Sequence, residues 1–493
     1  MKTKRVLLAL LAGLLVISST GCGNGEKQTA SDNGAYNIVW YNGFSPSDDN
    51  DMVFEAISQK TMEKINATVT AVPIQSADYA EKIKMLIAAN EKMDLLFMSR
   101  TNGYVTLAAQ KAFLPVDDLL KSHGQDILNL IPDHIFDGAK YQGKIYAVPV
   151  LKDWPHEPVL RYNTMMAEKY NFDMESVKSL ADLTPMLQTI KDNEPDWLPI
   201  LNRGDSPLFK LLPFENISGS SIAGFKLDDY SKIVNKFDTD EAREYFKLMR
   251  DWYQKGFIKK DAATATNDTE WYQSGKFFAA YSESLPYLED QINLNVAEHK
   301  LTKFLHGLVP PQLGTFDVQG CMNSISALSK NPEKTMEFLN LLYTDKEIKN
   351  MVNLGIEGKH YVAVGENQYD FPEGVTKSSE TGYDGVGYES MVGNRFLSRI
   401  RVGIAEDIWE KYKEFNESAL VSEALGFVFD AAPVINEITA LENVYSEYMP
   451  SLLVGAVDPD EVLPKALEKM KVAGIDKVLE EMNNQYQAWK ANK

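Results

Sequence analysis

The chain has 493 residues, and its 70 acidic side chains outnumber 50 Lys and Arg side chains to leave a formal net charge of −20 at pH 7. That charge argues against nucleic acid and against anionic lipid as partners, because both repel an acidic surface. The length fits two domains or lobes better than one, and it is sufficient to bury a large core.

The N-terminus has the pattern of an export signal. Lys2, Lys4 and Arg5 precede an apolar run over residues 6–17, which is shorter than a membrane span of about 20 residues and typical of a signal peptide. The run is followed by Ser-Ser-Thr-Gly-Cys, ending at Cys22, which resembles the lipobox of bacterial lipoproteins except for a serine where leucine is usual. The resemblance implies cleavage directly before Cys22 and attachment of a diacylglyceryl group to its sulfur. An ordinary signal peptide with a chance cysteine is the alternative.

A polar segment over residues 22–35 has no apolar periodicity and predicts a solvated tether after a signal peptide of residues 1–21. No later stretch has the length and apolar character of a membrane span. The second cysteine, Cys321, has no partner once Cys22 carries lipid, so no intrachain disulfide is expected. We therefore expect the protein on the outer face of the cytoplasmic membrane, attached to that membrane through its lipid anchor. We also expect it to be a monomer.

Alternating strands and helices open the mature chain. Residues 36–41 predict a buried strand, 67–74 a second and 94–98 a third, with a helix between each pair. This pattern predicts a parallel sheet with right-handed crossovers. Ligands of such sheets bind beyond the carboxyl ends of the strands, which points to residues 41–50 and 99–103.

Further strands and a helical end follow. Residues 144–150 predict a strand that runs into a crossover stiffened by two prolines next to Trp154, and residues 277–281 predict another strand. From residue 431 onward the pattern is almost entirely helical. One apolar stripe of this helical end consists of Val434, Ile438, Leu441, Tyr445 and Tyr448.

Several short motifs occur in a fixed order along the chain. The most recurrent are residues 113–120 (FLPVDDLL) and 143–149 (GKIYAVP). The others are residues 79–97, 271–280, 338–345, 355–361, 426–430 and 474–478. Together they resemble the extracellular solute-binding proteins of ABC importers, in the carbohydrate-binding, family 1-like branch, and within it a lipoprotein subfamily with a distinctive helical C-terminal region. The resemblance covers nearly the whole mature chain.

The resemblance implies a two-lobe, periplasmic-binding-protein-like α/β fold with parallel-rich sheets, a three-stranded hinge and a helical C-terminal region. We expect residues 36–150 and 310–360 in the N-terminal lobe, and residues 151–309 and 361–493 in the C-terminal lobe.

The implied hinge is crossed near residues 148–158, near residues 308–312 and after His360. Closure of the lobes around a ligand is the conformational change that a transporter recognises.

The implied function is capture of a sugar and its delivery to the membrane subunits of an ABC importer. The sugar is a mono- or oligosaccharide, and we interpret it as an oligosaccharide. A lipid-anchored sensor or adhesin and a carbohydrate-active enzyme are the alternatives.

Sugar recognition needs flat aromatic faces and polar groups that can bind two hydroxyls at once. Eight side chains on the loops and strand ends described above are expected to bind the ligand: Tyr41, Phe44, Arg100, Trp154, Tyr281, Tyr388, Asn394 and Arg395. Such side chains also fill ordinary cores, so packing is the alternative for each. Arg100 and Arg395 would favour an acidic sugar if both faced the cleft.

The sequence shows no pattern of catalytic groups. Adjacent carboxylates such as Asp117 and Asp118 do not amount to the two carboxyl groups that flank one bond in a glycosidase. The six histidines have no metal-ligand spacing, and no nucleophile elbow or phosphate loop is present. We expect no catalytic residue, no metal and no cofactor.

Overall fold

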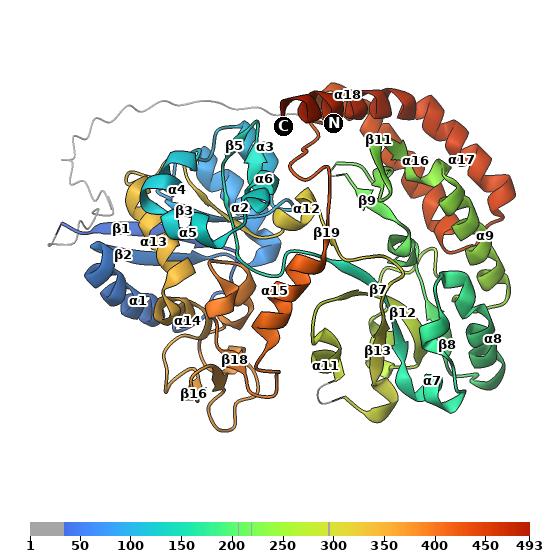
Figure 1. Ribbon diagram of the computed structural model, residues 1–493, viewed down its shortest axis with the longest axis horizontal. Helices are drawn as coiled ribbons and strands as arrows, with labels where there is room; N and C mark the ends of the chain where they lie inside the picture. The colour runs from blue at the N-terminus through green and yellow to red at the C-terminus, as the bar shows by residue number, and fades with distance from the viewer. Residues whose placement is uncertain (1–33, 206, 218, 294–295) are drawn as a thin grey trace, which may run out of the picture.

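Two α/β lobes lie side by side and are joined by three chain segments (Figure 1). The computed structural model describes residues 34–205, 207–217, 219–293 and 296–493. The expected signal peptide, the lipidation site Cys22 and the tether up to residue 33 lie outside the described residues. Within the described part of the chain, no helix combines the length and the apolar character that crossing a membrane requires.

A five-stranded sheet forms the centre of the first lobe, in the order β2-β1-β3-β15-β6. The three strands at the start of the chain are parallel, as expected, and β1 lies between its partners β2 and β3. The sheet is nevertheless mixed, because β15 runs antiparallel to β3 and β6. The strands are β1 (Tyr36–Asn42), β2 (Ala67–Pro73), β3 (Leu95–Met98), β6 (Val148–Pro149) and β15 (Met322–Ile325).

Both faces of this sheet are covered by helices. Successive side chains of a strand point to opposite faces, so neighbouring residues of one strand belong to different buried clusters. Leu95 belongs to the cluster formed with α1, α13 and α14, whereas its neighbour Leu96 belongs to the cluster formed with α2 and α3. The helices of the lobe are α1 (Asn50–Ile65), α2 (Ser76–Ala88), α3 (Tyr104–Ala109), α4 (Asp117–His123), α5 (Gln125–Leu130), α6 (Asp133–Ala139), α13 (Pro332–Thr344) and α14 (Lys346–Leu354), with a small hairpin of β4 (Lys140–Tyr141) and β5 (Lys144–Ile145).

The second lobe contains two sheets. Its four-stranded sheet has the order β13-β7-β12-β8, in which only β12 and β8 are parallel. The strands are β7 (Glu157–Asn163), β8 (Leu198–Leu201), β12 (Phe277–Ser284) and β13 (Thr302–Leu305), and a three-stranded antiparallel sheet consists of β9 (Phe214–Asn216), β10 (Ala223–Lys226) and β11 (Asp229–Asn235).

The helical C-terminal region is an integral part of the second lobe. Met449, Met470 and Met482, one from each of its three long helices, lie in the same buried cluster as Met249 of α9. Figure 1 shows these helices, in red, beside α9. The helices of the lobe are α7 (Thr164–Lys169), α8 (Thr184–Asn193), α9 (Asp240–Gln254), α10 (Thr269–Ser274), α11 (Leu288–Asn293), α16 (Ile435–Leu453), α17 (Pro459–Ala473) and α18 (Ile475–Asn492).

The three crossing segments hydrogen-bond to one another. In the first segment, His156 exchanges two backbone hydrogen bonds with Gln312 of the second, at 3.0 and 2.8 Å. The second segment contains β14 (Gln312–Leu313), which pairs in parallel with β19 (Leu420–Val421) of the third. The hinge is therefore a narrow, continuous backbone ribbon between the lobes.

The expected third crossing after His360 is displaced by about sixty residues along the chain, to β19. The first part of residues 361–418, expected in the second lobe, packs on the first lobe instead, because Tyr383, Tyr388 and Val392 belong to the same buried cluster as Leu339 of α13. The end of this segment lies between the lobes, since Trp409 and Tyr412 share a cluster with Leu285 and Tyr287 of the second lobe. After β19 the chain continues into the helices of the second lobe. The elements of this segment are β16 (Val362–Val364), β17 (Gln368–Asp370), β18 (Ile400–Arg401) and α15 (Ile408–Ser418).

Candidate functional site

A cavity of about 670 Å³ lies between the two lobes. The first lobe contributes Arg100, and the segment of the second crossing contributes Phe316 and Asp317 from α12 (Thr315–Val318). The second lobe contributes most of the remaining lining, from β9, β12, the loop before β9 and the helix α16. The cavity thus has one smaller and one larger wall, and the hinge lies at its base.

The smaller wall presents an aromatic ring beside a cation. Arg100 follows the carboxyl end of β3, where a parallel sheet places its ligands. Its guanidinium carbon lies 3.1 Å from the ring centroid of Phe316, and its Nη1 donates a hydrogen bond to the Phe316 carbonyl oxygen. Burial lowers the pKa of Arg100, which still carries its charge at neutral pH. Phe316 is 42% exposed, so a flat apolar face remains open for a ligand.

Tyr281 of β12 is the corresponding aromatic side chain on the larger wall. Its hydroxyl donates to Glu283 Oε1 at 3.0 Å, and the Lys210 ammonium lies 5.1 Å from its ring centroid. Burial and the neighbouring Glu283 carboxylate raise the pKa of Tyr281, so its hydroxyl stays protonated and can donate. An aromatic ring, a carboxylate and a cation are therefore grouped at one place on this wall.

Polar side chains from the hinge form the base of the cavity. His156 Nδ1 lies 2.7 Å from Asp317 Oδ1, and Asp317 Oδ2 accepts a 2.7 Å hydrogen bond from the Gly314 amide. Burial opposes the charge of His156, but the hydrogen bond to Asp317 together with the negative charges of Asp317, Glu283 and Glu215 outweighs burial and raises the pKa of His156. Nearby, burial raises the pKa of Glu215, whose Oε2 accepts from the Tyr230 hydroxyl at 2.7 Å. A ligand at this base would contact the residues that join the lobes.

Two of the eight expected ligand residues, Arg100 and Tyr281, line this cavity. Three others lie within the first lobe, away from the cavity lining. Phe44 and Tyr388 are buried and stack on each other, with ring centroids 3.2 Å apart, and the Tyr388 hydroxyl donates to the Ser45 carbonyl at 3.2 Å. Tyr41 packs at the edge of the cluster that contains Leu96. The ring faces of Phe44 and Tyr388 are therefore occupied by protein, and Tyr41 is a partly buried residue outside the cavity lining, whereas all three were expected to face the ligand.

The remaining three, Trp154, Asn394 and Arg395, also have protein partners. Trp154 is 6% exposed and its indole N–H donates to the Val150 carbonyl at 2.8 Å. The Asn394 amide donates to the Tyr343 carbonyl at 3.2 Å. These two positions are structural, because their side chains complete the packing between the first crossing and the segment after His360.

Arg395 forms a buried ionic network on the first lobe. Its guanidinium binds the carboxylates of Asp153 and Glu389, and it lies 4.7 Å from the ring centroid of Tyr412. Burial opposes the charge, but these two carboxylates raise the pKa of Arg395 further above its usual range. Since only Arg100 of the two arginines reaches the cavity, the condition under which they would favour an acidic sugar is not met.

Several residues that line the cavity were not predicted from the sequence. Phe316 lies four residues beyond the expected second crossing. An aromatic residue so close to the hinge is the feature of the sequence that could have identified it as a ligand residue. Lys210 lies outside every motif recognised in the sequence. Tyr445 falls in an apolar stripe, and Glu442 lies one turn before it on the same helix, so both resemble residues of an ordinary amphipathic helix. Among the described residues, no group of three or more His, Cys, Asp or Glu side chains is arranged to hold a metal ion.

Two family models match the chain. One, described as a bacterial extracellular solute-binding protein, matches residues 55–358. The other, described only as a domain of unknown function, matches residues 423–491, which is the helical C-terminal region.

Named relatives match along almost the whole length. A carbohydrate ABC transporter substrate-binding protein from Streptococcus pneumoniae serotype 4 is 29% identical over 509 residues, covering 99% of this chain and 97% of the relative. Lipoprotein LipO from Bacillus subtilis is 20% identical over 483 residues, covering 90% of each chain.

Solved structures of the N-glycan transport solute binding protein NgtS from Streptococcus pneumoniae also match. One superposes with a TM-score of 0.81 at 26% identity, covering 93% of this chain and 100% of that one. The complex of the same protein with Man5GlcNAc superposes with a TM-score of 0.65 at 27% identity, covering 93% of this chain and 99% of that one.

Proposed function

Because the chain belongs to the bacterial extracellular solute-binding proteins, we propose that it captures an oligosaccharide in the cavity between its lobes and delivers it to an ABC importer. The observation that carries this proposal is the pairing of aromatic faces with hydrogen-bonding groups across the cavity. Phe316 on one wall and Tyr281 on the other can stack on the apolar faces of sugar rings, and Glu283 and Arg100 beside them can bind hydroxyls.

The size of the cavity supports an oligosaccharide. Its volume of about 670 Å³ lies well inside the range of about 300–1,000 Å³ that is usual for organic ligands of several rings. The named relatives agree with this choice, since one is a carbohydrate transporter component and NgtS is solved with Man5GlcNAc.

The unequal walls support an order of events. The second lobe supplies most of the lining, so we propose that the sugar binds there first and that the first lobe then closes over it with Arg100 and Phe316. The chain superposes better on one NgtS structure, with a TM-score of 0.81, than on the NgtS complex with Man5GlcNAc, with a TM-score of 0.65, which is the kind of difference expected if the lobes move.

We also propose that diacylglyceryl attachment to Cys22 holds the protein at the outer face of the cytoplasmic membrane. The lipobox-like N-terminus and the match to a named lipoprotein support this anchor. Mass spectrometry of the N-terminal peptide from the membrane fraction tests it, and a peptide without acyl mass would refute it.

Calorimetric titration of the purified mature chain with a panel of oligosaccharides, including Man5GlcNAc and kestose, tests the binding function. We expect one site and, at a ligand concentration 100 times Kd, a gain of about 2.7 kcal/mol in unfolding free energy. Chromatography of the sugar after incubation should return it unchanged, because a receptor releases what it binds. Failure of every sugar to bind, or steady formation of product, would overturn the proposal.

A further inference from the structure

The helix α16 of the C-terminal region reaches the cavity. Glu442, Tyr445 and Leu453, all from this helix, line it. Glu442, Tyr445 and Met449 are spaced by three and four residues, so they lie on one face of the helix. Part of this face therefore meets the cavity while the rest meets the core of the second lobe.

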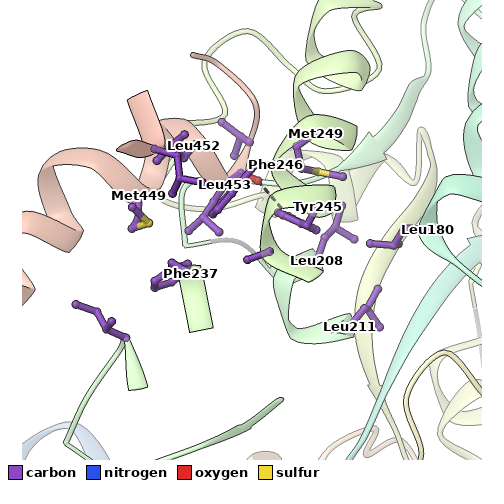
Figure 2. Close-up of a cluster of buried hydrophobic side chains, with 14 of the residues drawn as sticks. Leu180, Leu208, Leu211, Phe237, Tyr245, Phe246, Met249, Met449, Leu452 and Leu453 are labelled. Carbon is purple, nitrogen blue, oxygen red and sulfur yellow. Dashed lines mark hydrogen bonds between the residues drawn. The ribbon is translucent and has the colours of Figure 1, made fainter. Parts of the chain in front are cut away.

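The core holds this helix firmly. Figure 2 shows Met449, Leu452 and Leu453 inserted among side chains of the second lobe, including Phe237 and Phe246. The Tyr245 hydroxyl donates a hydrogen bond to the Leu453 carbonyl at 3.1 Å (Figure 2). With these side chains fully buried, α16 has little freedom to move, and Glu442 and Tyr445 have set positions in the cavity wall.

Glu442 connects the C-terminal region to another part of the lining. Its Oε1 accepts a 3.1 Å hydrogen bond from the Ser221 amide, and Ser220 and Ser221 both line the cavity. One oxygen of this half-buried carboxylate thus positions the loop, and the carboxylate itself lies in the lining of the cavity.

A buried lysine lies on the same wall. Lys236 lines the cavity, is 6% exposed, and donates a hydrogen bond to Asn216 Oδ1. Burial lowers the pKa of Lys236 to about 8, and the negative charge of Glu442 partly opposes this. At neutral pH the wall therefore offers a cationic donor in the neighbourhood of an anionic acceptor. Two neighbouring sugar hydroxyls, one donating and one accepting, match that combination.

We propose that the C-terminal helical region is a ligand-binding wall of the second lobe, in which Glu442, together with Lys236, binds hydroxyls of the captured oligosaccharide while it holds the Ser220–Ser221 segment in place. This role rests on the proposed function and gives residues 423–491 a part in specificity in addition to their part in the core. It also explains why these helices share a core with the second lobe, since a wall that contacts the ligand must move with the lobe that binds it.

Three variants separate the two roles of Glu442. Glu442→Gln keeps an oxygen that can accept from Ser221 but removes the charge, whereas Glu442→Leu removes both. The matched control is Glu437→Gln on the same helix, where Glu437 pairs with Lys477 and does not line the cavity. Calorimetric titration with Man5GlcNAc reports ligand affinity, and amide hydrogen exchange of residues 219–224 reports the order of the loop.

We expect Glu442→Gln to raise Kd about tenfold with unchanged exchange of the loop, because a charge-assisted hydrogen bond to the sugar is lost. Glu442→Leu should raise Kd further and also accelerate exchange, and the control should change neither quantity. Wild-type affinity in Glu442→Gln, when the wild type binds the sugar, would overturn this inference and leave the proposed function standing. A wild type that binds no sugar of the panel would overturn the proposed function and this inference with it.

Discussion

Two aromatic side chains near the hinge have opposite roles at the scale of the residue. Phe316 presents an exposed ring to the cavity, and Trp154 is enclosed by the first lobe with its indole N–H satisfied by Val150. A stacking platform acts on ligand affinity, whereas a buried ring acts on the stability of the fold. Substitution of each should therefore change a different measured quantity.

We predict that Phe316→Ala weakens oligosaccharide binding by about 1–3 kcal/mol, roughly ten- to hundredfold in Kd, with little change in unfolding free energy. Trp154→Ala should lower the unfolding free energy by about 3–5 kcal/mol and leave the Kd of the folded protein near that of the wild type. Calorimetric titration and urea unfolding of both variants check this. A loss of affinity confined to Trp154→Ala would reverse the two assignments.

At the scale of the element, the end of α16 depends on a glycine. Gly455 has φ +75°, in the region that favours glycine, and a Cβ at this position would collide with the Met249 carbonyl of α9. The Arg250 guanidinium donates to the Gly455 and Ala456 carbonyls at 3.1 and 3.2 Å, which completes the junction of the two helices. The close approach of α16 to α9 therefore requires a residue without a side chain.

We predict that Gly455→Ala lowers the unfolding free energy by about 3 kcal/mol or more, since it combines backbone strain with overpacking. Gly403→Ala is the matched control, because Gly403 has φ +94° but nothing within 4 Å of an added Cβ, so strain alone acts there. Urea unfolding of both variants measures the difference. Equal losses would show that the contact with α9 contributes nothing.

At the scale of the whole molecule, the two walls of the cavity belong to different lobes. These lobes are connected by the hinge ribbon and also touch beside α15, where the Tyr287 hydroxyl donates to Asp407 at 2.8 Å. The ribbon is held by main-chain hydrogen bonds, including Ser422 N–H to the Leu313 carbonyl at 2.9 Å. We expect closure to be stabilised by contacts between the ligand and the smaller wall, where Arg100 and Phe316 are the available groups.

We predict that Arg100→Ala still binds the sugar through the second lobe, with a Kd raised about tenfold, but shows a smaller ligand-induced decrease in radius of gyration than the wild type. Tyr281→Ala, on the larger wall, should lose affinity at least as strongly, while the complex that forms at saturating sugar closes normally. Small-angle X-ray scattering at saturating ligand distinguishes the two. Full contraction of Arg100→Ala would show that closure does not depend on this side chain.

The sequence alone determined the features that depend on neighbours along the chain. Alternation of strands and helices over residues 36–98 predicted a parallel sheet, which β1 forms with β2 and β3, and it pointed to residues 99–103, where Arg100 lies at the carboxyl end of β3. The ordered motifs identified the two-lobe fold and the family, because each motif is local. The helical C-terminal region followed from its apolar periodicity in the same way.

Only the tertiary structure decided which side chains meet the cavity and where the chain changes lobes. Phe44 and Tyr388, more than 300 residues apart in sequence, occupy each other's faces, and Arg395 is neutralised by Asp153 and Glu389, so all three lie outside the cavity lining. Glu442 and Tyr445 lie on a helix whose periodicity is the same whether its face meets a core or a ligand. Periodicity records that a face is covered, and long-range packing determines what covers it, which is why the fold was predictable and most of the site was not.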